Sequence, residues 1–120
     1  MARSYQDFVQ EALGRVKEIP PEDLLQKMRS SEGMILLDVR EQDEFARGHL
    51  PGALLIPRGV LEGQATQMIR NPAAEVIVYC GSGMRSALAA DVLQQMGFSN
   101  VASLAGGFRD WAQIGGPIQH

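Results

Sequence analysis

The sequence predicts an α/β protein with an open, mostly parallel central sheet covered by helices on both faces. Short apolar runs of strand length alternate along the chain with segments in which apolar residues recur at helical spacing. The short runs are apolar throughout rather than at every second position, which is typical of parallel strands that are buried on both faces. The chain has 120 residues, a length that suits one compact domain.

The first predicted element is an amphipathic helix over residues 4–18. Ser4 is positioned to cap its start, with Asp7 three residues later. Six apolar side chains then share one face at helical spacing: Tyr5, Phe8, Val9, Ala12, Leu13 and Val16. We therefore divide the chain into a helical extension over residues 1–18 and a compact domain over residues 19–116.

Four alternating elements begin the domain. A Pro-Pro pair breaks the first helix and begins a second over residues 21–30, whose first turn is acidic. The apolar run at 34–39 predicts a strand, and the segment at 41–48 predicts a short helix. A second strand is predicted over 52–57, where a proline ends it.

The second half of the domain repeats the alternation. A helix weakened by two glycines is predicted over 59–71, and the clearest strand of the chain over 75–80. Good helix-forming residues fill 86–96 until a glycine stops them. A strand over 100–106 and a helix over 108–114 complete the domain, and Gly-Gly-Pro ends that helix.

The charge and the apolar pattern of the chain limit its partners. The net charge of −3 provides no broad attraction for nucleic acid or for an anionic membrane. No apolar stretch is long enough to span a bilayer, and the N-terminal residues lack the apolar centre of a signal peptide. We expect a cytoplasmic location and neither nucleic acid nor a membrane as a partner.

The cysteine count limits the chemistry. Cys80 is the only cysteine, so an intramolecular disulfide is excluded. Together with His49 and His120 it supplies too few ligands for a cysteine-ligated zinc site. Any redox partner of Cys80 must therefore come from another molecule.

The segment from Cys80 to Arg85 carries the strongest chemical signal. It follows the strand at 75–80 and precedes a helix, and ligands of parallel sheets bind beyond the carboxyl ends of strands. Gly81 and Gly83 allow the backbone to curl so that its N–H groups point inward. The helix start and the arginine add positive charge, so an anionic sulfur is favoured at the centre of the loop. The alternative is that Cys80 is simply a small buried apolar side chain.

Several segments resemble the rhodanese family in their order along the chain. The first signature of the family is matched by Leu37-Asp38-Val39-Arg40, Glu44-Phe45, Gly48-His49-Leu50-Pro51-Gly52-Ala53 and Ile56-Pro57. The loop from Cys80 to Arg85, followed by Ser86, is similar to the active-site loop of the family. Leu104, Gly106-Gly107 and Trp111 are similar to its closing segment. The resemblance spans most of the chain and leaves only the first helix outside.

The resemblance implies an open parallel α/β sheet and a sulfurtransferase. A sulfur donor such as thiosulfate or another persulfide would give its sulfane sulfur to Cys80, and a thiol or cyanide would then remove it. The implied partners are small sulfur donors and thiol acceptors, with a protein persulfide donor or a thiol protein as further options. The implied reaction uses no metal and no organic cofactor.

The candidate site residues lie in and around the loop. Cys80 is the expected catalytic residue. The expected substrate-binding residues are Arg85, Gly81, Ser82, Gly83, Met84 and Arg58, the last of which follows another strand. Asp38 and Ser86 are expected to support the loop, and Arg40 is expected to pair with Glu44, four residues later at a helix start.

Two features bear on the choice of donor and on the alternative functions. The loop has one basic residue, whereas rhodaneses that favour thiosulfate often carry more positive charge there, which argues against thiosulfate as the donor. The same architecture also hosts phosphatases and arsenate reductases, but phosphatase loops of this shape have one residue more between cysteine and arginine than the four found here. A non-catalytic rhodanese-like binding module is the remaining alternative, and such modules have usually lost the cysteine.

Overall fold

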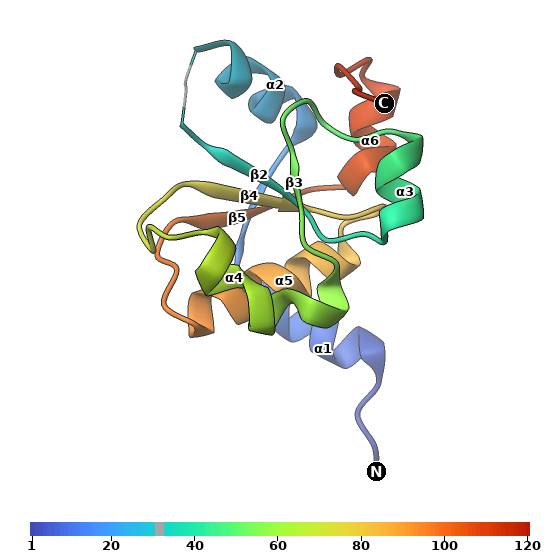
Figure 1. The fold of residues 1–120 in the computed structure, drawn as a ribbon. Coiled ribbons are helices and arrows are strands. Elements are labelled where there is room, and N and C mark those ends of the chain that lie inside the picture. Colours follow the sequence, from blue (N-terminus) through green and yellow to red (C-terminus); the bar gives the residue numbers. More distant parts are fainter. Residues whose placement is uncertain (31–32) are drawn as a thin grey trace.

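A five-stranded sheet forms the centre of the computed structural model, which describes residues 1–30 and 33–120 (Figure 1). The strands have the order β1-β5-β4-β2-β3, and every pairing between them is parallel. Their bounds are β1 (Lys17–Ile19), β2 (Ile35–Asp38), β3 (Leu54–Leu55), β4 (Val76–Tyr79) and β5 (Val101–Leu104). The predicted fold class is confirmed, and β4 occupies the middle of the sheet.

Helices cover both faces of this sheet, as Figure 1 shows. One face carries α2 (Pro21–Ser30) and α6 (Gly107–Gln113), and α3 (Gln42–Arg47) lies beside α6. The other face carries α1 (Tyr5–Leu13), α4 (Leu61–Met68) and α5 (Met84–Gln95), with a 3₁₀ turn, η1 (Arg58–Val60), before α4.

Each face of the sheet has its own apolar core, because successive side chains of a strand point to opposite sides. On β4, Val76 and Val78 pack toward α4 and α5, whereas Ile77 and Tyr79 pack toward α2 and α6. Cys80 belongs to the core on the α5 side. The two cores bury the central strand completely, so the residues that follow it start from a fixed position.

The N-terminal segment differs from its prediction. The capping box is confirmed, since the backbone N–H of Asp7 donates to Ser4 Oγ at 3.1 Å and the N–H of Ser4 donates to Asp7 Oδ2 at 2.9 Å. The helix, however, ends at Leu13, and the chain then forms β1, a strand that the sequence did not predict. The expected boundary between residues 18 and 19 therefore falls within a strand of the central sheet.

The apolar face predicted for this helix is only partly buried. Val9 and Ala12 are buried against the domain, and α1 packs on α5. Tyr5 and Phe8 remain 49% exposed, because they lie at the margin of that contact rather than beneath it. Of the helices that the structure describes in residues 1–30 and 33–120, none has the length and the apolar character needed to cross a bilayer.

Candidate active site

The loop after β4 lies at the centre of the carboxyl edge of the sheet. β4 ends at Tyr79, and Cys80 follows as the first residue of the loop, with its side chain buried. Arg85 lies in the first turn of α5, so the loop spans the short gap between the middle strand and this helix. The segments that follow β2 and β5 flank it, since those strands are the neighbours of β4.

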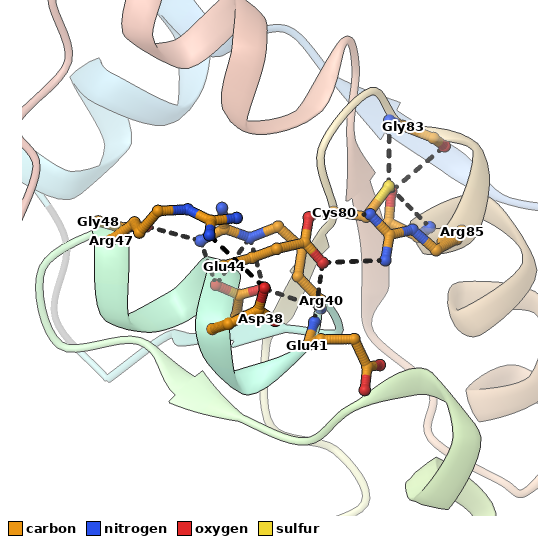
Figure 2. Close-up of polar contacts among 11 residues, drawn as sticks. Asp38, Arg40, Glu41, Glu44, Arg47, Gly48, Cys80, Gly83 and Arg85 are labelled. Atoms are coloured by element: carbon orange, nitrogen blue, oxygen red, sulfur yellow. Dashed lines mark hydrogen bonds and ion pairs between the residues drawn. The ribbon is translucent and has the colours of Figure 1, made fainter.

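Backbone N–H groups converge on the sulfur of Cys80 (Figure 2). The N–H of Gly83 donates to Cys80 Sγ at 3.1 Å, and the N–H of Ser86 donates to it at 3.3 Å. Ser86 Oγ lies 3.5 Å from the same sulfur and 2.8 Å from Ser103 Oγ. The site therefore directs backbone N–H donors from the start of a helix at this sulfur, and such an arrangement suits an anion.

The shape of the loop is set by close contact with the start of α6. The N–H groups of Phe108 and Arg109 donate to the carbonyl oxygens of Cys80 and Gly81 at 2.8 and 3.0 Å. Gly107 sits so close to the loop that a Cβ there would lie 2.5 Å from the Cys80 oxygen. With these carbonyls bound to α6, the loop turns its N–H groups toward the sulfur.

A glycine also allows the final turn of the loop. Gly83 precedes α5 with φ +101°, a region that favours glycine, and its Cα faces the backbone of Gly106 closely enough that a Cβ would lie 3.2 Å from that nitrogen. Ser82 is exposed and Met84 is 37% exposed, so these two residues lie at the solvent side of the loop; their contact with a substrate stays a prediction.

Arg85 binds a carboxylate that the sequence assigned to another arginine. Its Nη1 and Nη2 each lie 3.3 Å from an oxygen of Glu44 in α3 (Figure 2). Hydrogen bonding to this carboxylate raises the pKa of Arg85 further above its usual value. The predicted pair between Arg40 and Glu44 is wrong, because the parallel sheet places α3 beside the start of α5.

Glu44 is held from two sides. Its Oε1 also accepts the N–H of Glu41, an arrangement that caps the start of α3. Burial favours the neutral carboxyl, but the hydrogen bonds from Arg85 and from the N–H of Glu41, with the charges of Arg85 and Arg40, keep the pKa of Glu44 below its usual value. The carboxylate is therefore ionised when it contacts Arg85.

Asp38 binds Arg40 rather than the loop. Its oxygens accept hydrogen bonds from the backbone N–H and from the guanidinium of Arg40 at 2.7 to 3.2 Å, and both side chains are buried. Arg40 also donates to the Gly48 oxygen and lies 4.4 Å from the centre of the Phe108 ring. Because the N–H of Phe108 binds the Cys80 oxygen, one route by which Asp38 could support the loop runs through Arg40 and Phe108; its role stays a prediction.

Arg58 lies on a different surface feature. It pairs with Glu62 one turn later at 2.9 Å. It also borders a groove of about 380 Å³ between α1 and α5, whose other lining residues include Tyr5, Phe8 and Leu88. The loop residues do not line this groove, so contact between Arg58 and a donor stays a prediction.

Three participants in the site were not predicted as such. Ser103 on β5 contacts Ser86, and Glu44 binds Arg85. Gly107 has no Cβ and so allows the start of α6 to contact the loop. The Gly-Gly pair after β5 was the available signal for the last of these, since two glycines at the carboxyl end of a strand indicate close approach of the backbone. Within residues 1–30 and 33–120, no three His, Cys, Asp or Glu side chains gather so as to hold a metal ion.

Comparison with known proteins identifies chains that are related to this one in sequence. The sequence profile of the rhodanese-like domain matches residues 21–114. Over 103 residues, the chain is 36% identical to a protein of Allochromatium vinosum named Sulfurtransferase, which covers 86% of this chain and 94% of that protein. YrkF of Bacillus subtilis, provisionally named a sulfur carrier protein, is 38% identical over 96 residues, which are 80% of this chain. This chain spans only about half of YrkF, since the match covers 51% of its length.

A solved structure extends the similarity to the first helix. A protein of unknown function from Rhodopseudomonas palustris, described as a possible tyrosine phosphatase, superposes with a TM-score of 0.91. It is 30% identical in sequence, and the superposition covers 99% of this chain and 96% of that one.

Proposed function

Since this chain belongs to the rhodanese-like domain family, we propose that it is a sulfurtransferase that carries sulfane sulfur as a persulfide on Cys80. Transfer of sulfur is the activity that its relatives' names support. The observation that carries the proposal is the convergence of the N–H groups of Gly83 and Ser86 on Cys80 Sγ. A cysteine that served only as a core side chain would not need donors aimed at its sulfur.

The first half-reaction loads the cysteine. The Cys80 thiolate attacks the sulfane sulfur of the donor, a new S–S bond forms at Sγ, and the donor's own bond to that sulfur breaks. Thiosulfate would leave as sulfite and a persulfide would leave as a thiolate, each with the bonding electron pair. The outer sulfur of the new persulfide carries negative charge, which N–H groups of the loop stabilise.

The second half-reaction removes the sulfur from the Cys80 persulfide. A thiolate or cyanide attacks the outer sulfur, and Cys80 leaves as a thiolate. The negative charge then lies on Sγ of Cys80, to which the N–H groups of Gly83 and Ser86 donate. The cycle needs no external oxidant or reductant, because each step exchanges one bond of the sulfane sulfur for another and the acceptor gains the sulfur that the donor loses.

Other loop residues have defined parts in this proposal. Gly81, Gly83 and Met84 give the loop its radius, and Ser82 lies at its exposed side. Ser86 contributes its N–H to the sulfur and its hydroxyl to the contact with Ser103. Arg85 adds a cation at the margin of the site.

Intact mass measurement tests the proposal directly. Incubation with thiosulfate, with a low-molecular-weight persulfide or with a cysteine desulfurase and its substrate should add the mass of one sulfur atom. Cyanide or a small thiol should then remove it. Cys80→Ser should gain no sulfur, because an alcohol does not form a persulfide, and the near-isosteric change should preserve the fold.

The same assay separates the alternatives. If no donor adds sulfur while an alkylating agent still modifies Cys80, the sulfurtransferase proposal fails and a binding module is favoured. The description of the Rhodopseudomonas protein as a possible tyrosine phosphatase applies to that protein, and an aryl phosphate tests it here. We expect no Cys80-dependent release of phosphate, because four residues between Cys80 and Arg85 form a smaller cradle than a phosphate-binding loop. The cytoplasmic location stays a prediction.

A further inference from the structure

We propose that Glu44 determines donor preference by neutralising Arg85, so that the Cys80 loop disfavours dianionic thiosulfate and favours persulfide donors. Glu44 would act as a positioning residue, because it reaches the reacting sulfur only through Arg85. The inference rests on the proposed sulfurtransferase function and deepens it by naming the class of donor.

The contact between the two side chains leaves Arg85 poorly placed to serve as a free cation. Both terminal nitrogens of its guanidinium face the two oxygens of Glu44, each at 3.3 Å. Figure 2 shows this carboxylate facing the guanidinium beside the loop that holds Cys80. The pair is half-buried, with side chains 38% and 28% exposed, so water screens it incompletely.

Glu44 cannot easily turn away from this contact. The N–H of Glu41 donates to its Oε1 at 3.0 Å, and this bond belongs to the cap of α3. Rotating the carboxylate away from Arg85 would break the cap as well as the ion pair. The negative charge is therefore fixed at the margin of the loop by its own helix.

The other arginines on the elements near this edge of the sheet also have carboxylate partners. Arg40 is buried against Asp38, and three other arginines, which are more exposed, also pair with carboxylates: Arg47 with Asp43, Arg58 with Glu62 and Arg109 with Asp110. Between Cys80 and Arg85 the loop itself contains no charged residue. In the described part of the chain, Arg40, Arg85 and Arg109 near Cys80 are thus each paired with a carboxylate, and the backbone N–H groups and the helix start supply the remaining positive charge.

This charge distribution separates the two kinds of donor. Thiosulfate brings two negative charges to a thiolate, and a neutralised arginine offers it little net attraction. A persulfide brings one negative charge or none at its sulfane sulfur, so the partial charges of the N–H groups suffice for it. The penalty from the Glu44 carboxylate therefore weighs more heavily on thiosulfate.

Glu44→Gln tests the inference with little change of structure. Glutamine at this position still accepts the N–H of Glu41, because capping boxes use Glu or Gln, but it removes the charge. We expect kcat/KM for thiosulfate to rise about tenfold, mainly through a lower KM, and the value for a cysteine persulfide donor to change less than about twofold. The thiosulfate value of the variant should also fall more steeply with added salt, as expected for a newly uncompensated cation.

Asp43→Asn is the matched control. It removes one carboxylate from the same helix, but Asp43 pairs with Arg47 on the exposed side. This variant should leave the ratio of kcat/KM for thiosulfate to kcat/KM for the persulfide donor unchanged. Glu44→Asp keeps the charge on a shorter side chain, so its ratio of kcat/KM values for the two donors should lie closer to that of the wild type than to that of Glu44→Gln.

The outcomes distinguish this inference from the function on which it rests. The role of Glu44 would be rejected, while sulfur transfer stands, by either of two results. One is that Glu44→Gln changes kcat/KM equally for both donors; the other is that Asp43→Asn shifts the ratio of the two kcat/KM values as much as Glu44→Gln does. Absence of a Cys80 persulfide in the wild type and in Glu44→Gln with both donors would reject the sulfurtransferase proposal itself, and this inference with it.

Discussion

Cys80 owes its surroundings to backbone groups rather than to charged side chains. The N–H groups of Gly83 and Ser86 reach Sγ, whereas Arg85, the arginine that ends the loop, is bound to Glu44. The spacing of cysteine, glycines and arginine was therefore enough to predict the loop from the sequence. The pairing of Arg85 was not predictable, because 41 residues separate it from Glu44 and only the order of the strands brings them together.

Asp38 and Arg40 form the buried ion pair next to this loop, and its removal should be costly. In Asp38→Ala the guanidinium would remain buried without its carboxylate, so we expect the free energy of unfolding to fall by about 3 kcal/mol or more. Asp43→Asn removes an exposed carboxylate and should cost less than about 1 kcal/mol. Urea unfolding followed by circular dichroism compares them; similar small losses in both variants would show that Arg40 is held mainly by Gly48 and Phe108.

At the scale of elements, the start of α6 shapes the active-site loop. Gly107 has φ +60°, and a Cβ there would meet the Cys80 oxygen at 2.5 Å. Gly115 has φ +75° with open space around it, so it provides a control for backbone strain alone. Substitution of Gly115 measures the cost of a positive φ alone, whereas substitution of Gly107 adds the cost of a steric clash with the loop.

Gly107→Ala should therefore harm both stability and sulfur transfer. We expect Gly115→Ala to cost about 1 kcal/mol, as a left-handed alanine does, with unchanged persulfide formation. Gly107→Ala should cost about 2 kcal/mol more, because the loop or the helix must move, and should slow persulfide formation on Cys80. Unfolding curves and the rate of mass gain measure the two effects. Equal behaviour of the variants would mean that α6 yields without disturbing the loop.

Elements with a clear local signal were predicted well, and those without one were not. The helix at 21–30 and the central strand were found almost to the residue, because the helix begins at a proline with acids in its first turn and the strand is apolar throughout. β1 was missed since Lys17, Glu18 and Ile19 contain no apolar run; its strand conformation comes from pairing with β5. Val16 does pack against the core, so the periodicity that extended the first helix reflected burial and not helical structure.

At the scale of the whole molecule, Tyr79 links the central strand to the turn after α3. Its hydroxyl accepts the N–H of Leu50 at 3.1 Å, and the side chain is fully buried. Burial, together with the charge and hydrogen bonding of Asp38, raises the pKa of Tyr79 well above its usual value. The folded protein therefore keeps this proton at a pH where an unfolded chain loses it.

This difference predicts loss of stability in alkaline solution. Below about pH 10 both states hold the proton and the contribution is constant; above it the unfolded state ionises first, so the free energy of unfolding falls as pH rises. Tyr79→Phe should cost about 1 kcal/mol at pH 8 through the lost bond to Leu50, but should decline less steeply above pH 10. Urea unfolding from pH 8 to 11 compares the slopes. Parallel declines would assign alkaline sensitivity to other groups.

The sheet ends on its two shortest strands. β1 has three residues and β3 has two, and they occupy the opposite edges, while the longer strands lie inside. An exposed edge is a template on which strands of another molecule can add, and the number of free backbone groups sets how firmly they hold. Edges this short give an incoming strand very few ladder hydrogen bonds. The brevity that makes β1 hard to recognise thus also guards the protein against self-association into extended sheets.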